Sequence, residues 1–200
     1  MKHDLIIRGG KLVTANETYT ADIGIKDGRI ATLGEDLDGN DIINADKKLV
    51  MPGGIEAHCH IAQESANGIM TSDDYETGSI SAAFGGNSCF VPFAAQKKGK
   101  SIASTIAEYD RRAETKSVID YSYHLILTAP NQNVMNELPS AFERGITSFK
   151  VFMTYATRIS DAQFLDILTI ARRHGGLTMV HAENHDMLSW MSNALTQGGY

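Results

Sequence analysis

The stretch SFKVFMTYATRISDAQFLDILTIARRHGGLTMVHAEN, residues 148–184, contains a strand, a helix and a second strand in that order. Ser148–Met153 and Leu177–Glu183 are short apolar runs, which predict buried strands. Ser160–His174 lies between them, begins with a capping-box pair, Ser160 and Gln163, and is followed by two glycines that end a helix. The residues expected on its apolar side are Phe164, Leu165, Leu168 and Ala171. Two strands joined through a helix predict a parallel pair with a right-handed crossover.

The same alternation extends on both sides of this stretch, from residue 51 onward. The other expected strands are Ile55–His60, Ser88–Ala95 and Tyr121–Thr128. The other expected helices are Asp73–Phe84, with a capping box of Asp73 and Glu76, Ser101–Thr115, a shorter one ending near Arg144, and Asp186–Thr196. This series predicts an α/β parallel sheet, either doubly wound or a TIM-type (β/α)8 barrel truncated after about five units. The glycine-rich loops lack the spacing of a dinucleotide site, so we examined the C-terminal strand ends, where barrels carry catalytic residues.

The first fifty residues have a different sequence pattern, with short expected strands separated by turn dipeptides. Gly9-Gly10 and Asp27-Gly28 both suit hairpin turns that need positive φ. The strands expected around them are Asp4–Arg8 with Lys11–Thr14, and Asp22–Lys26 with Arg29–Leu33. The sequence therefore predicts a small β-rich, sandwich-type segment over residues 1–50 and the α/β hydrolase-type barrel over residues 51–200.

Composition narrows the classes of function. The net charge is -6 and the sequence pI is about 5.6, so the composition does not indicate a basic surface for binding nucleic acid or an anionic membrane. No apolar run approaches the roughly 18–20 residues of a membrane span, and the N-terminal apolar stretch is too short for a secretory signal. Two cysteines, Cys59 and Cys89, fit a reducing compartment and are most simply small buried apolar residues. We expect a soluble, cytoplasmic protein.

His58 and His60 lie at the end of the first strand of the α/β region. Residues i and i+2 of a strand point to the same face, so both imidazoles are expected to project together while Cys59 points away. Two neutral imidazoles form half of a site for zinc or a similar ion. Taken alone, the pair is also compatible with two unrelated polar side chains.

Lys150 lies inside a strand that a parallel sheet is expected to bury on both faces. Burial lowers the pKa of an ammonium group, although a lysine can also extend to solvent or form an ion pair. A neutral amine can react with carbon dioxide, and the resulting carbamate is an anion that can bridge two cations. His181 ends the next strand and by itself suits a core histidine. His58, His60, Lys150 and His181 all lie near the C-terminal ends of expected parallel strands. Their convergence there favours a metal site.

Three segments resemble the D-hydantoinase and dihydropyrimidinase family of the amidohydrolase superfamily. They are Pro52–His60 (PGGIEAHCH), Ser148–Tyr155 (SFKVFMTY) and Val180–Asn184 (VHAEN), and they occur in the family's order. The likeness covers essentially the whole chain, including the β-rich segment. One departure is Glu56, where the family more commonly has Asp, at a position that does not bind metal.

The resemblance implies a role for each matching residue. His58 and His60 bind one ion, Lys150 becomes N6-carboxylysine and bridges two ions, and His181 binds the second. Tyr155 donates a hydrogen bond to the oxyanion, although it also suits a surface tyrosine. Loops around Ile61–Met70, Phe93–Gly99 and Thr154–Ser160 shape the pocket for the substrate's substituent, with Met70, Phe93 and Phe152 as possible walls. Two divalent ions are implied, zinc most simply, with manganese or cobalt possible, together with carbon dioxide.

The implied reaction is hydrolysis of the cyclic amide of hydantoins or 5,6-dihydropyrimidines by a metal-bridging hydroxide, as in pyrimidine catabolism. The family's sixth-strand histidine and eighth-strand aspartate have no counterpart before Tyr200, so we expect an incomplete enzyme with little or no turnover. A full-length protein is expected to form a homotetramer or homodimer. The alternatives are a non-catalytic dihydropyrimidinase-related scaffold protein and another cyclic amidohydrolase such as an allantoinase.

Overall fold

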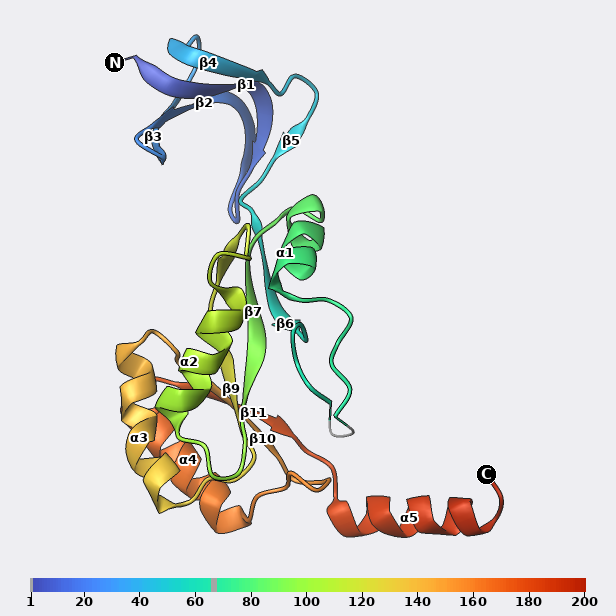
Figure 1. The fold of residues 1–200 in the computed structure, drawn as a ribbon. Helices are drawn as coiled ribbons and strands as arrows, with labels where there is room; N and C mark the ends of the chain where they lie inside the picture. Colours follow the sequence, from blue (N-terminus) through green and yellow to red (C-terminus); the bar gives the residue numbers. More distant parts are fainter. Residues whose placement is uncertain (1, 66–67) are drawn as a thin grey trace. The chain divides into compact units, whose positions relative to one another are not determined.

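The computed structural model describes residues 2–65 and 68–200. Contacts between Cα atoms divide the chain into two compact units, residues 1–53 and residues 54–200 (Figure 1). Each unit has its own sheet and its own buried apolar cluster.

The first unit is one mixed sheet in the strand order β3-β2-β1-β4, with β5 also paired to β1. Its strands are β1 His3–Val13, β2 Thr18–Lys26, β3 Arg29–Gly34, β4 Gly39–Asn44 and β5 Leu49–Val50. The predicted hairpin at Asp27-Gly28 is confirmed, with φ of 51° and 71° at the two turn residues. A second sheet that would complete a sandwich is not formed by the described part of residues 1–53.

The hairpin predicted at Gly9-Gly10 is wrong, because β1 runs straight through both glycines. The pairing of β1 with β2 shifts register between Ile7 and Gly10, and Gly9 has φ of 69°. The N–H of Gly9 donates to Asp22 Oδ1 at 2.8 Å. The glycine at positive φ thus makes a β-bulge within one strand. His3 is buried, and its ring bonds Asp38 O and Thr32 Oγ1.

The second unit is built on a parallel sheet in the order β11-β10-β9-β7-β6, with the short β8 beside β7. Its strands are β6 Gly54–Cys59, β7 Asn87–Gln96, β8 Asp120–Tyr121, β9 His124–Leu127, β10 Ser148–Phe152 and β11 Leu177–His181. The strands follow one another in chain order without a reversal. Right-handed crossovers in one direction place all the helices on one face, which is the arrangement of a barrel wall and not of a doubly wound sheet.

In the described part of the second unit, five helices connect and follow these strands (Figure 1). They are α1 Tyr75–Phe84, α2 Ile102–Ala113, α3 Gln132–Glu143, α4 Asp161–Arg173 and α5 His185–Gln197. The helix predicted to be shorter, α3, has the same 12 residues as α2. None of the helices in the described ranges is both long and apolar enough to cross a membrane.

The core of the second unit lies between the sheet and the helices. Phe149 and Val151 point from β10 into it and are fully buried. On α4 the buried residues are Ile167 and Ala171, whereas Leu165 and Leu168 are exposed. Of the four residues predicted for the apolar side, Ala171 is buried and Phe164 packs against the core, as predicted, whereas the prediction is wrong for the two leucines. The predicted capping box of Ser160 and Gln163 is confirmed.

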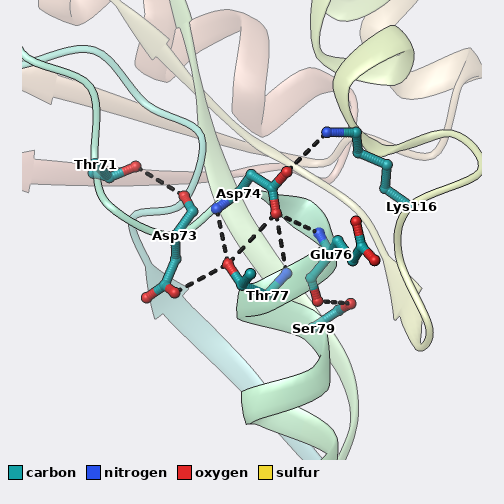
Figure 2. Close-up of polar contacts among 7 residues, drawn as sticks. All are labelled: Thr71, Asp73, Asp74, Glu76, Thr77, Ser79 and Lys116. Atoms are coloured by element: carbon teal, nitrogen blue, oxygen red, sulfur yellow. Dashed lines mark hydrogen bonds and ion pairs between the residues drawn. The ribbon is translucent and has the colours of Figure 1, made fainter.

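The start of α1 differs by one residue from the prediction. Asp74, and not Asp73, is the N-cap, and its Oδ1 accepts from the N–H groups of Glu76 and Thr77 at 2.9 and 3.0 Å (Figure 2). Thr77 completes the capping box, because its Oγ1 accepts from the N–H of Asp74. Lys116 Nζ lies 2.8 Å from Asp74 Oδ2. The hydrogen bond and charge of Lys116, helped by the backbone donors, lower the pKa of Asp74 from 3.8 to about 2.

These contacts predict an acid-sensitive contribution of Asp74 to stability. Because the carboxyl pKa is depressed in the folded state, the contribution is present above pH 4 and is lost as the pH falls toward 2. Asp74→Ala should lower the melting temperature at pH 7, and the difference from wild type should shrink over that window. The pair with Lys116 is solvent-exposed, so most of the effect should survive 0.5 M salt through the N-cap bonds. Asp73→Ala is the matched control, and an equal loss in both variants would contradict the assignment of the cap.

Candidate metal centre

His58 and His60 are placed by an irregular end of β6. Glu56 pairs with Phe90 and Cys59 pairs with Pro92, so Ala57 and His58 together face the single residue between those two on β7. Two residues against one is a β-bulge, a device that redirects side chains near functional sites. Both histidine rings turn to one place, with their centroids 5.7 Å apart.

Phe93 supports these two rings from the neighbouring strand. Its ring stacks on His60 with a centroid distance of 4.8 Å and meets His58 edge-on at 4.8 Å. Phe93 is itself 1% exposed, so the surrounding core fixes the position of its ring. The two imidazoles therefore rest against a rigid aromatic wall while remaining exposed on the other side.

Lys150 and His181 are brought together by the register of β10 and β11. Lys150 pairs with Met179 and Phe152 pairs with His181 in a parallel ladder. Lys150 and Phe152 share a face of β10, and His181 shares it through its pairing with Phe152. The face opens onto a cavity, and Lys150 is half-buried, so the prediction of a lysine buried on both sides of the strand is wrong.

A cavity of about 160 Å³ collects the four predicted metal-binding residues. It is lined by His58, His60, Phe93, Ile126, Lys150, Phe152 and His181. The Nζ atom of Lys150 lies over the face of the Phe152 ring, 5.5 Å from its centroid. Among residues 2–65 and 68–200, no three His, Cys, Asp or Glu side chains converge on a single ion position.

Two of the three histidines have one ring nitrogen held by an oxygen acceptor. His60 Nδ1 lies 2.6 Å from Gln63 Oε1, and His181 Nε2 lies 2.5 Å from Glu183 Oε2. The held nitrogen carries the proton, which leaves Nε2 of His60 and Nδ1 of His181 with free lone pairs. An oxygen acceptor behind the imidazole is the usual arrangement of a metal-binding histidine.

Tyr155 follows β10 in a strained backbone conformation, with φ of 67°. Its ring lies 5.1 Å from His181, and its hydroxyl donates to Glu183 Oε2 at 3.1 Å. The carboxylate raises the pKa of Tyr155, so the phenol keeps its proton at neutral pH. The hydrogen bond from His181 and, to a smaller extent, the hydrogen bond from Tyr155 lower the pKa of Glu183. Left-handed φ at a tyrosine costs free energy, so the surrounding structure must hold this conformation in place.

A second cavity of about 600 Å³ adjoins the first through Ile126 and Phe152. The three loops predicted to shape a substituent pocket all contribute to it, although residues 66–67 of the first loop lie outside the described residues. Its loop residues are Gln63, Glu64, Ser65, Gly68, Ala95, Lys97, Lys98, Tyr155, Ala156 and Thr157. Lys97 and Glu64 form an ion pair between two of the loops. Phe152 lines both cavities and Phe93 lines the smaller, whereas Met70 lines neither.

Sequence reasoning missed the partners of the predicted residues. Gln63 and Glu183 bind ring nitrogens, and the only signal was their position two or three residues after a histidine. His124 is buried, and its ring bonds Ala57 O and Ser148 Oγ. Burial lowers the pKa of His124, so its ring is neutral at pH 7. Cys59 is half-buried, and desolvation raises the pKa of its thiol to about 11.

Comparison with known proteins gives consistent relatives. A D-hydantoinase of Geobacillus stearothermophilus is 39% identical over 200 residues, which is 98% of this chain and 42% of that protein. The dihydropyrimidinase of Rattus norvegicus is 33% identical over 195 residues, which is 92% of this chain and 37% of that protein. A solved structure of a D-hydantoinase superposes with a TM-score of 0.94 at 40% identity, covering 98% of this chain and 43% of that one. No protein-family model matches the chain.

The mixed sheet, the parallel half-barrel and these neighbours define a chain of the barrel-type amidohydrolase class. Within that class the chain is similar to D-hydantoinases and dihydropyrimidinases over more than nine-tenths of its length, so the predicted resemblance to that family is confirmed. The chain spans about two-fifths of the length of the curated relatives that it matches.

The contacts of Glu183 give a direct prediction for Tyr155. Glu183→Gln removes the charge that raises the pKa of Tyr155, so this pKa should fall toward its ordinary value near 10. Titration of the Tyr155 Cζ resonance in ¹³C-tyrosine-labelled protein measures the shift. Glu143→Gln, at the exposed end of α3, is the control for a general change in charge. An unchanged Tyr155 pKa in Glu183→Gln would show that the hydrogen bond does not form in solution.

Proposed function

We propose that this chain supplies the metal-binding half-barrel of an enzyme that hydrolyses the ring amide of hydantoins or 5,6-dihydropyrimidines. The observation that carries the proposal is the single cavity lined by His58, His60, Lys150 and His181 at the ends of β6, β10 and β11. Similarity to D-hydantoinases and dihydropyrimidinases supports cyclic amides as the substrates.

The donor set fits two divalent ions better than one. The three histidines do not converge on a single point, but they line one cavity with Lys150 among them. His58 and His60 would bind one ion and His181 the other, using the ring nitrogens left free by Gln63 and Glu183. Nitrogen ligands of this kind suit zinc, with manganese or cobalt as alternatives. When bound, such ions polarise a carbonyl group and lower the pKa of water.

Lys150 is assigned as the bridging residue after reaction with carbon dioxide. The lone pair of the neutral amine forms a bond to the carbon of carbon dioxide, one C–O π bond becomes an oxygen lone pair, and the nitrogen loses a proton. The proton passes to solvent water, and the product is N6-carboxylysine, an anion with two oxygens. The position of Lys150 in the cavity that His58, His60 and His181 also line supports this assignment.

The remaining residues position the substrate. Tyr155 would turn its hydroxyl from Glu183 to the substrate carbonyl oxygen and donate a hydrogen bond there as negative charge develops. The 600 Å³ cavity would hold the ring substituent next to the reacting amide, with Phe152 between the two spaces. A group that delivers a proton to the leaving nitrogen is still required, and none of the assigned residues of this chain has that role.

Lys150→Ala tests the bridging role. The wild-type chain, produced with zinc and bicarbonate, should retain zinc and show a mass increase of one carbon dioxide in native mass spectrometry. Lys150→Ala should show neither the added mass nor retained zinc, because the two histidine groups then lack a bridge. Lys48→Ala, at an exposed position of the first unit, should behave as wild type.

Each measurement has an outcome against the proposal. Retention of zinc by Lys150→Ala at the wild-type level would remove Lys150 from the site. Absence of bound zinc, manganese and cobalt in the folded wild-type chain would contradict the proposal and favour the alternative of a non-catalytic scaffold relative.

A further inference from the structure

One peptide group at the end of β6 is held by side chains instead of by a neighbouring strand. The carbonyl oxygen of Ala57 accepts from His124 Nε2 at 2.8 Å, and the N–H of His58 donates to Glu56 Oε1 at 2.9 Å. These two groups belong to the same peptide bond, which directly precedes the Cα atom of His58.

The β-bulge explains why this peptide needs other partners. The register of β6 and β7 shifts between Glu56 and Cys59, and the residue opposite Cys59 is Pro92, which has no N–H to donate. A peptide turned out of a ladder leaves one donor and one acceptor to satisfy. The bond to the Ala57 carbonyl is partly buried, so leaving that oxygen without a partner would cost free energy, whereas the bond from the His58 N–H is exposed. Glu56 and His124 supply the two missing partners.

His124 reaches this peptide across the inside of the curved sheet. It lies on β9, whose neighbours in the sheet are β7 and β10, so β6 lies one strand further away. The other ring nitrogen, Nδ1, lies 2.5 Å from Ser148 Oγ, and Ser148 is two residues before Lys150 on β10. One buried ring therefore connects the strand that carries His58 with the strand that carries Lys150.

The hydrogen-bond partners also determine the tautomer of His124. A carbonyl oxygen can only accept, so Nε2 carries the proton and donates to Ala57. Nδ1 of the neutral ring is then an acceptor, and the hydroxyl of Ser148 donates to it. In this one orientation, the His124 ring makes both hydrogen bonds, one to Ala57 on β6 and one to Ser148 on β10.

We propose that His124 is a positioning residue that, with Glu56, fixes the Ala57–His58 peptide and so directs the His58 and His60 rings toward Lys150 and His181. The inference rests on the proposed metal centre for its functional consequence, but the hydrogen bonds that it requires can be tested without metal. Fixing the peptide sets the direction of the Cα–Cβ bond of His58. Phe93, which touches His58, His60 and His124 with ring centroids 4.8, 4.8 and 5.1 Å away, fills the space between these rings.

The first experiment examines the metal-free chain. Nuclear magnetic resonance of protein labelled with ¹⁵N and ¹³C should show scalar coupling through the hydrogen bond between His124 Nε2 and the carbonyl carbon of Ala57. The His124 nitrogen shifts should be those of the Nε2–H tautomer. Absence of the coupling, or the other tautomer, would overturn the inference whatever the metal content of the protein.

The second experiment measures affinity for Co²⁺ by visible absorbance in four forms of the 200-residue chain. The variants are His124→Leu, which removes both hydrogen bonds, His124→Gln, which can donate and accept, and Thr105→Val. Thr105 is a buried polar residue of α2 whose hydroxyl bonds Ser101 O, so its loss tests destabilisation alone. Loss of a residue behind metal ligands typically weakens binding about 10–100-fold, which is the effect expected for His124→Leu.

His124→Gln should recover most of the affinity, and Thr105→Val should bind as wild type does. Wild-type affinity in His124→Leu, or an equal loss in Thr105→Val, would overturn the inference while leaving the proposed function intact. Absence of Co²⁺ binding by the folded wild-type chain would contradict the proposed function and the positioning role together, whereas the coupling would still report whether His124 holds the peptide.

Discussion

The parallel register of β10 with β11 is the constraint on which the rest of the site depends. Because Phe152 pairs with His181, the side chains of Lys150, Phe152 and His181 are committed to one face of the sheet. A shift of one residue would turn His181 to the opposite face and separate it from the lysine. The register is held by apolar side chains on the other face, where Phe149 and Val151 are fully buried against the helices. Core packing on one side of the sheet therefore determines the chemistry on the other.

The fold was predictable where periodicity and turn chemistry agree. The strands β6, β7, β10 and β11, the helix from Asp161 to Arg173 and the hairpin at Asp27-Gly28 all follow from patterns within one short window, whereas the strand predicted over Tyr121–Thr128 is divided into β8 and β9. The predictions were wrong where one short sequence pattern is compatible with two local structures. Gly9-Gly10 suits a turn and a bulge equally, and only the long-range pairing with Asp22 and β2 selects the bulge. Adjacent aspartates before α1 are equivalent as caps until Lys116, far along the chain, approaches one of them.

The candidate site shows the same limit. His58, His60, Lys150 and His181 were identifiable because each lies near the end of a predicted strand, and parallel strands end at one edge. The bonds that orient them were not identifiable, because His124 acts across an intervening strand and the bulge at Ala57–His58 depends on Pro92 of the neighbouring strand. The degree of burial of Lys150 also could not be predicted, since it depends on a cavity that several strands enclose together.

X-ray absorption at the zinc edge of zinc-loaded protein tests the central claim most directly. The account predicts nitrogen and oxygen neighbours with imidazole scattering, and a second zinc at about 3.5–4 Å, the separation typical of two-metal sites. A single zinc with no heavy neighbour, or sulfur in the first coordination sphere, would contradict it. Sulfur ligation would place the ion at a cysteine and outside the cavity that the histidines and Lys150 enclose.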